Sequence, residues 1–320
     1  MPRPTTLVGA ADPDDNDRHA NTTQAGHSRG ARRGVAEPGQ LSVWATAQST
    51  GPVQRRGRYV PDSVKHPARM LPAIAAHAIG AYTQPGDLVL DPMCGIGTTL
   101  VEAVHAGRDA IGVEYESKWS DIADANVAHA HTQGATGRAS VVRGDATRIT
   151  SLLPAALAGQ VSLVVTSPPY GPTVHGLVRP EAGAGVHKSD NTYNDGDKGN
   201  LAYRDLPGLA DGFAEILAGC ATLLKPGGVV VVTARPWRKR GELVDLPSAV
   251  IGAGIAAGLV PVERCVALLA AVRGGRLIAR PSFFQLSTVR KARQAGLPMH
   301  LIAHEDVIVL TLPQGEGEAA

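Results

Sequence analysis

Apolar and polar positions follow two rhythms from about residue 67 onward. Short apolar runs, rich in Val, Leu and Ile, predict buried strands at 87–91, 110–114, 139–143, 161–166 and 229–234. Longer Ala-rich stretches predict helices at 67–81, 98–106, 118–133 and 209–224. Strands and helices that alternate in this order predict an α/β fold, with a parallel sheet and right-handed crossovers.

The two ends of the chain break this rhythm. Residues 262–272 and 306–312 are strand-like and separated by a Gly- and Arg-containing excursion, which predicts an antiparallel pair at the sheet edge. Residues 1–54 are polar and lack apolar periodicity, so we expect a disordered tail whose removal leaves folding intact. One domain over 55–320 is predicted to follow, and the Gly- and Asp-rich stretch 171–205 is expected to be a mobile loop over its active site.

Composition narrows the class of protein. The chain of 320 residues is 43% hydrophobic, so it can bury a sizeable core, and global disorder is excluded. Cys94, Cys220 and Cys265 are odd in number and far apart, which predicts neither a disulfide framework nor a zinc site. The sequence has no secretory leader pattern and no apolar stretch of membrane-spanning length, so we expect a cytoplasmic protein without a membrane partner.

The net charge of +2 is small, but basic residues concentrate in one span. Between 235 and 293 the chain carries eleven Lys and Arg against three acids, a net charge of +8. The basic residues are Arg235, Arg238, Lys239, Arg240, Arg264, Arg273, Arg276, Arg280, Arg290, Lys291 and Arg293. Both a phosphate-binding surface and a solvated basic face are compatible with this distribution.

A glycine-containing turn from Asp91 to Thr99 joins the first predicted strand to its helix. In doubly wound sheets, ligands bind outside the carboxyl ends of the strands, and glycines let the backbone approach them closely. A dinucleotide site requires a third glycine where this chain has Leu100. Asp91 would repel a pyrophosphate but attract the ammonium of a methionine moiety, so S-adenosylmethionine is favoured over NAD.

Acids also stand at the ends of the next two predicted strands. Glu114 is placed to bind both ribose hydroxyls of the cofactor, and Asp145 to accept a hydrogen bond from an adenine amine. An acid at one strand end is usually a helix cap or a solvated turn. Three acids at successive strand ends indicate a cofactor site.

The tetrad Ser167-Pro168-Pro169-Tyr170 directly follows the fourth predicted strand. An exocyclic base amine is a poor nucleophile until acceptors hold its N–H groups. The Ser167 hydroxyl and the Pro168 carbonyl are suitable acceptors, and Tyr170 can stack on a planar base. The alternative is that the two prolines merely end a strand.

These two motifs together resemble the amino-methyltransferase family that acts on N4 of cytosine or N6 of adenine in DNA. Lys65-His66-Pro67-Ala68 resembles the segment that these enzymes place over the methionine end of the cofactor. The resemblance implies a Rossmann-like, doubly wound, mostly parallel sheet of seven strands with one antiparallel strand, and S-adenosylmethionine as cofactor. The cofactor site would comprise Pro67, Asp91, Pro92, Cys94, Gly95, Gly97, Thr98, Thr99, Glu114, Asp145 and Ala146, and the catalytic site Ser167, Pro168, Pro169 and Tyr170.

Several alternatives stay open. Ser167 at the first tetrad position is typical of the N4-cytosine branch, whereas the N6-adenine branch usually has Asp or Asn there. The chain leaves little room for a DNA-recognition domain, and its motif order is also similar to that of tRNA guanine-N2 methyltransferases, so an RNA substrate is the second candidate. Protein glutamine methylation and a non-catalytic cofactor-binding regulator are more remote. His175 and His187 lack partners at metal-ligand spacing, so no metal is assigned. The sequence does not indicate the recognition site, a restriction partner or the oligomeric state.

Overall fold

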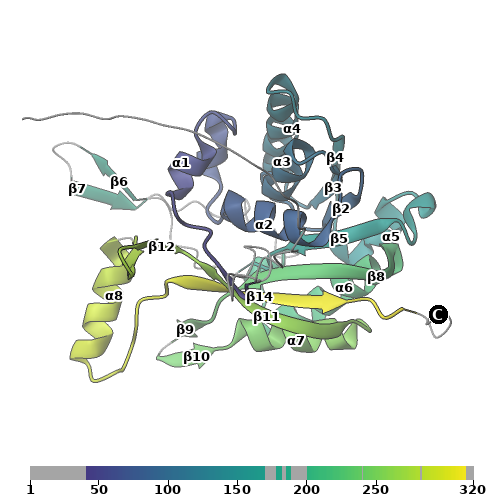
Figure 1. The fold of residues 1–320 in the computed structure, drawn as a ribbon. Helices are drawn as coiled ribbons and strands as arrows, with labels where there is room; N and C mark the ends of the chain where they lie inside the picture. The colour runs from purple at the N-terminus through teal and green to yellow at the C-terminus, as the bar shows by residue number, and fades with distance from the viewer. Residues whose placement is uncertain are drawn as a thin grey trace, which may run out of the picture. The chain divides into compact units, whose positions relative to one another are not determined.

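The computed structural model describes residues 41–169, 178–181, 185–188, 200–239, 241–281 and 283–314. A mixed sheet of eight strands, in the order β1-β11-β14-β8-β5-β2-β3-β4, forms its centre (Figure 1). Its strands are β1 (Val43–Trp44), β2 (Leu88–Asp91), β3 (Asp109–Glu114), β4 (Ala139–Arg143), β5 (Val161–Thr166), β8 (Leu224–Ala234), β11 (Val260–Leu268) and β14 (His304–Thr311). Neighbouring strands are parallel except that β14 runs antiparallel to both β8 and β11.

The predicted α/β class and the single reversed strand are therefore confirmed. The sheet has one more strand than the seven expected, because the two residues of β1 pair with Val266 and Ala267 of β11. A pair of residues carries no periodicity, so this strand could not be found from the sequence pattern.

Helices cover both faces of the sheet, and side chains that alternate along the strands fill two separate cores. On one face α2 (Pro72–Tyr82), α3 (Thr98–His105) and α4 (Ser117–Thr132) pack on Val89, Leu163 and Val165. On the other face α6 (Leu206–Leu223) and α7 (Leu246–Ala256) pack on Leu90, Val164 and Val230. Figure 1 shows α2 and α3 on one side of the strands, and α6 and α7 on the other. Successive residues of β2 and β5 thus serve opposite cores, as the period of two requires.

Several shorter helices and strand pairs surround the central sheet and its helices. They are α1 (Gly51–Arg55), a 3₁₀ turn (Pro61–Lys65), α5 (Ile149–Leu152), α8 (Phe283–Gln294) and the strand pairs β6/β7 (Val178–Glu181, Gly185–Lys188), β9/β10 (Trp237–Lys239, Glu242–Val244) and β12/β13 (Ala270–Arg273, Arg276–Ala279). The pair β6/β7 lies within 171–205, where a mobile loop was expected; the other residues of 171–199 lie outside the described part of the chain.

Residues 41–54 differ from the predicted disordered tail. Trp44 is buried and stacks on His77, with ring centroids 4.2 Å apart. The side-chain amide of Gln54 donates to the carbonyl of Thr46 (2.9 Å) and accepts from the backbone N–H of Ala73 (3.0 Å). Pairing with β11 and contacts from Leu268, Arg273 and Arg280 also hold this segment, and contacts with such distant residues are not visible in its composition. Residues 1–40 lie outside the described residues, so that part of the tail stays a prediction.

Two helices also differ from the sequence prediction. Helix α2 begins at Pro72 and not at Pro67, since the chain first makes the 3₁₀ turn that ends at Lys65. Helix α7 was missed because its residues are almost uniformly apolar and show no helical periodicity. Among the described residues, α6 is the one helix long and apolar enough to cross a membrane, and Phe213, Leu217 and Cys220 on its inner face pack in the core.

Candidate active site

A cavity of about 1160 Å³ opens at the carboxyl ends of β2, β3, β5 and β8. It brings together nearly all the residues that were predicted to bind cofactor or target. Those that line it are Pro67, Asp91, Pro92, Cys94, Gly95, Thr98, Thr99, Glu114, Asp145, Ala146, Ser167, Pro168 and Pro169. Gly97 does not line the cavity, and Tyr170 lies outside the described residues.

The glycine turn owes its shape to two left-handed residues. Gly95 has φ 53° and Gly97 has φ 77°, a region that residues with a side chain rarely adopt. A Cβ atom at Gly97 would lie 3.1 Å from the Cβ of Ala123 in α4. Gly97 therefore supports the turn from behind, because it lets α3 start directly against α4, while Gly95 presents its backbone to the cavity.

Asp91 ends β2 and is buried, 4% exposed. Its Oδ2 accepts from the Thr99 hydroxyl (2.7 Å), and its Oδ1 accepts from the backbone N–H of Met93 (3.1 Å). Burial raises the pKa of this carboxyl to about 6. None of its contacts among the described residues is a cationic side chain, so a bound ammonium would supply the missing countercharge.

Glu114, at the end of β3, fastens the glycine turn to the neighbouring strand. Its Oε2 accepts from the backbone N–H of Gly95 (2.8 Å), and its Oε1 accepts from that of Glu116 (2.9 Å). Burial raises the pKa of Glu114 to about 7. Each carboxylate oxygen keeps a second lone pair, so these bonds leave acceptor capacity for ribose hydroxyls.

Asp145 plays the smaller role that acids at strand ends often have. Its Oδ1 accepts from the backbone N–H of Thr147 (3.0 Å) and so caps the short 3₁₀ turn Ala146–Arg148. The capping side chain still lines the cavity beside Ala146.

His66, Trp119 and Asn126 support the turn and were not assigned roles from the sequence. The buried His66 ring packs edge-on against Trp119 (centroids 4.6 Å apart), and its Nε2 would lie 3.2 Å from a Cβ at Gly95. Burial lowers the pKa of His66 to about 3, so it packs as a neutral ring. The Asn126 side chain donates to the carbonyl of Ile96 (2.9 Å) and accepts from the N–H of Val60 (2.8 Å). Only the segment Lys65–Ala68 pointed toward this region.

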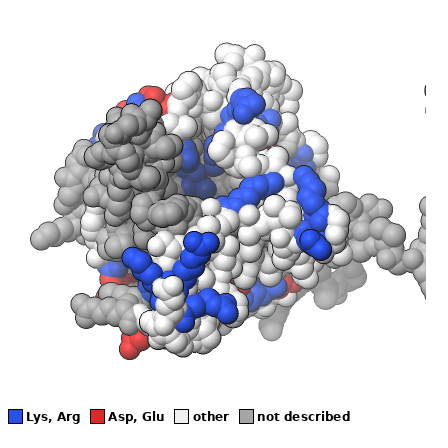
Figure 2. Space-filling model, turned by 90° about the vertical axis from the view of Figure 1, so that its left-hand side faces the viewer, with Lys and Arg blue, Asp and Glu red and all other residues white. Residues whose placement is uncertain are grey.

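The rim of the cavity is basic. Arg69 lines it on one side, and Arg235, Arg238 and Arg280 line it from the C-terminal part of the chain. Figure 2 shows Lys and Arg side chains around a hollow, with the acidic side chains at the edge of this view.

The basic residues between 235 and 293 do not all face the cavity. Arg264 pairs with Asp306 (2.8 Å) and Arg273 donates to Gln48 (2.6 Å), so these two serve the fold. Arg280 does both, since it lines the cavity and donates to the backbone carbonyls of Ala47 and Gln48. Arg240 and the side chain of Lys239 lie outside the described residues.

Two cavity-lining residues, Thr233 and Glu305, had no role in the sequence analysis. Thr233 lies near the end of β8 and Glu305 near the start of β14. Acids at the carboxyl ends of strands were the signal for site residues, and Glu305 stands near the amino end of its strand. On the reversed strand β14, it is the first residues that reach the same edge.

Comparison with known proteins bears on the first half of this site. Residues 14–125 match the model of a family described as DNA methylase. The resemblance to DNA amino-methyltransferases is confirmed. This family uses S-adenosylmethionine, and the matched segment contains the glycine turn and Glu114 but ends before Ser167.

The relatives are matched over short stretches. A type II methyltransferase, M.HinfI of Haemophilus influenzae, is 33% identical over 88 residues, which are 28% of this chain and 24% of that protein. M.MthZI of Methanothermobacter thermautotrophicus is 39% identical over 54 residues, 17% of this chain and 15% of that protein. The alignments thus cover about a quarter or less of these relatives. Among solved structures, TrmN from Thermus thermophilus is 18% identical with a TM-score of 0.46, over 81% of this chain and 53% of that one.

Proposed function

We propose that this protein is an S-adenosylmethionine-dependent methyltransferase that acts on an exocyclic amino group of a base in DNA, with N4 of cytosine favoured over N6 of adenine. The observation that carries the proposal is one cavity lined both by the glycine turn with its acids and by Ser167, Pro168 and Pro169. The family match supports the amino-methyltransferase class, and Ser167 at the first tetrad position supports cytosine.

The residues present fit the cofactor. Gly95 brings bare backbone to the cavity wall, and the buried Asp91 carboxyl suits the ammonium of the methionine moiety. Glu114 and Asp145 supply oxygens for the ribose and the adenine. When bound, S-adenosylmethionine supplies a methyl group on a positively charged sulfur.

The chain's own residues then activate the target. The Ser167 hydroxyl and the Pro168 carbonyl accept the N–H groups of the amine and turn its lone pair toward the methyl group. Proline at 168 and 169 limits the backbone, so the carbonyl is already aligned before substrate arrives. Tyr170 stacks on the base, which leaves the duplex to reach this depth.

The basic rim supports a nucleic-acid substrate. Arg69, Arg235, Arg238 and Arg280 can neutralise phosphates on both sides of a base that enters the cavity. The same rim suits RNA, so methylation of an RNA base, as in the tRNA guanine-N2 methyltransferases, is the second candidate. A cofactor-binding regulator without catalysis is the remote one. A cytoplasmic location accords with any of these and stays a prediction.

The decisive test is transfer of tritiated methyl from S-adenosylmethionine to genomic DNA and, separately, to total RNA, followed by nucleoside analysis. We expect the label in N4-methylcytosine of DNA. Label in N6-methyladenine would keep the protein among the DNA amino-methyltransferases but change the target base. Label in RNA alone would favour an RNA substrate, and no transfer to either pool would favour the non-catalytic cofactor-binding regulator.

A further inference from the structure

Glu305 lies at the same edge of the sheet as the catalytic tetrad. In the register of β14 and β8, Asp306 pairs with Ala234, so Glu305 comes one step nearer the cavity. In the register of β5 and β8, Thr166 pairs with Val232, and Ser167 follows directly. Ser167 is thus level with Thr233 and Glu305 with Arg235, so their backbones are two strands apart and two residues offset, about 12 Å at ordinary strand spacing. Both residues line the same cavity, with Thr233 of β8 between them, so a base that enters the cavity can meet both side chains.

We propose that the Glu305 carboxyl binds the ring nitrogen next to the target amine and thereby selects which base is methylated. This inference rests on the proposed function and deepens it. Glu305 would be a specificity-determining residue, whereas Ser167 and Pro168 act on the amine itself.

Hydrogen-bonding chemistry makes this contact selective. In cytosine and adenine, the ring nitrogen beside the amine is an acceptor. In guanine the amine lies between two ring nitrogens: N1 carries a hydrogen and is a donor on the base-pairing edge, whereas N3 is an acceptor on the opposite side. A protonated carboxyl can donate to the first kind of base, whereas an ionised carboxylate can accept only from the second.

The surroundings of Glu305 favour the protonated acid. Burial is the largest influence and raises the pKa of Glu305, and Asp306 acts in the same direction. Arg235, the hydrogen bond with the Thr233 side chain and His304 oppose this shift without cancelling it. On β11 the register partner of Glu305 is Ala267, which adds no charge. Glu305 therefore keeps its proton to a higher pH than an exposed glutamate does, which favours donation to cytosine or adenine.

The test compares two forms of the enzyme on two substrates, in the manner of a double-mutant cycle. Wild type and Glu305→Ala methylate a single-stranded DNA oligonucleotide that carries either cytosine or 3-deazacytosine, which lacks the acceptor nitrogen. We expect wild type to lose roughly tenfold in kcat/KM on the analogue, the worth of one buried hydrogen bond. Glu305→Ala should lose a similar factor on cytosine and should no longer distinguish the two substrates. If the target base is adenine, oligonucleotides that carry adenine and 1-deazaadenine replace those with cytosine and 3-deazacytosine.

Two further variants separate recognition from structure. Glu305→Gln keeps a donor on the side chain and should retain kcat/KM on cytosine within about threefold. Glu263→Gln, a carboxylate change on β11 away from the cavity, should leave both substrates unchanged.

Contrary outcomes are distinct. If Glu305→Ala still loses tenfold on the analogue, Glu305 does not contact the ring nitrogen, and the inference is wrong. If Ala and Gln at 305 lose equally and both lower the melting temperature, the residue only holds the cavity wall beside Arg235, which also overturns it. If the wild type methylates no oligonucleotide, the proposed function fails and this inference with it.

Discussion

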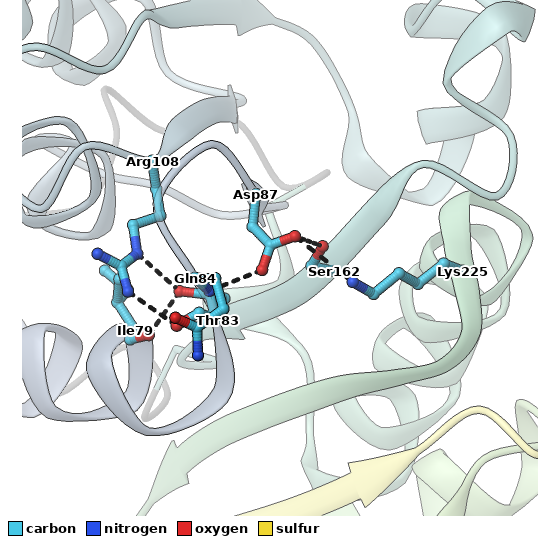
Figure 3. A network of polar contacts seen from close by, with 7 residues as sticks. All are labelled: Ile79, Thr83, Gln84, Asp87, Arg108, Ser162 and Lys225. Carbon is cyan, nitrogen blue, oxygen red and sulfur yellow. Dashed lines mark hydrogen bonds and ion pairs between the residues drawn. The ribbon is translucent and has the colours of Figure 1, made fainter.

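The two ends of strand β2 carry one aspartate each, and their surroundings differ in every respect. At the amino end, Asp87 accepts from the Ser162 hydroxyl (2.8 Å), from Lys225 (3.4 Å) and from the backbone N–H of Gln84 (2.7 Å). Figure 3 shows these partners converging on one carboxylate. At the carboxyl end, the partners of Asp91 are the hydroxyls of Thr99 and Thr166 and the backbone N–H of Met93, none of them a cation, and Asp91 lines the cavity.

The two pKa shifts run in opposite directions for this reason. At Asp87 burial raises the pKa, but the hydrogen bonds and Lys225 outweigh it, and the net shift is downward. At Asp91 burial prevails and the pKa rises to about 6. One aspartate stabilises the fold, while the other is held at a cost that a bound cation would relieve.

The amino end continues as a purely structural network. Arg108 donates from Nε to the Thr83 hydroxyl (3.0 Å) and from Nη2 to the Thr83 carbonyl (2.8 Å). These contacts join the end of α2 to the turn before β3 (Figure 3). At the amino end of β2, the polar groups are hydrogen-bonded to one another. At the carboxyl end, polar groups such as Asp91 line the cavity.

The largest effect should come from Gly97→Val. A β-branched side chain at φ 77°, with Ala123 already 3.1 Å from the new Cβ, must displace the start of α3. Calorimetric titration with S-adenosylmethionine should detect no binding. Gly80→Ala is the matched control, since a Cβ there meets nothing within 4 Å; it should bind normally. Undiminished affinity of the valine variant would show that the turn does not form the cofactor site.

Alanine at the two aspartates should separate binding from stability. Asp91→Ala should weaken cofactor affinity by at least about 100-fold, because a buried ammonium loses its partner. Asp87→Ala should leave that affinity within twofold and lower the free energy of unfolding by about 1–2 kcal/mol through lost hydrogen bonds. The pair is measured by titration calorimetry and urea unfolding, and equal effects of both changes on affinity would remove the distinction between the two ends.

The raised pKa of Glu114 predicts a pH dependence of stability. Its ordinary pKa is 4.5 and its folded pKa is about 7, so the folded state holds the proton longer as the pH rises. The free energy of unfolding should therefore fall between pH 5 and pH 8, by about 2 kcal/mol relative to Glu114→Gln, which has no proton to release. Urea unfolding of both proteins at the two pH values measures this difference; parallel pH profiles would contradict the burial of Glu114 as an acid.

Lys225→Met should have the smallest effect. The ion pair with Asp87 is 3.4 Å long and its lysine is 46% exposed, so water screens most of the attraction. Thermal unfolding at low and high salt should show a loss below about 1 kcal/mol that vanishes in high salt. A larger loss would mean that Asp87 depends on its cation more than on Ser162 and Gln84.

The sequence predicted the parallel half of the molecule well, since β2, β3 and β5 are apolar runs bounded by turns. The same regularity located Asp91 and Glu114 at strand ends, where the structure has them. Their second role, as hydrogen-bond acceptors that hold the glycine turn, was not predictable, because it depends on which backbone N–H groups the fold brings within hydrogen-bond distance.

What the sequence did not predict depends on contacts between distant segments. His66 beneath Gly95 and Asn126 beneath Ile96 join residues about 30 positions apart. Trp44 lies in a polar stretch, and its burial requires β11, more than two hundred residues later. Glu305 reaches the cavity only because β14 is reversed, and a reversed strand has the same apolar pattern as its parallel neighbours.

The position of β14 has a consequence for synthesis on the ribosome. Strands β2, β3, β4 and β5 are complete by residue 166, so this half can form while the chain is still being made. The final strand, His304–Thr311, must then enter between β8 and β11, and until it does both present unpaired backbone. Until residues 304–311 are synthesised and paired, the nascent chain therefore carries two open sheet edges, and in that interval it is most exposed to edge-to-edge association.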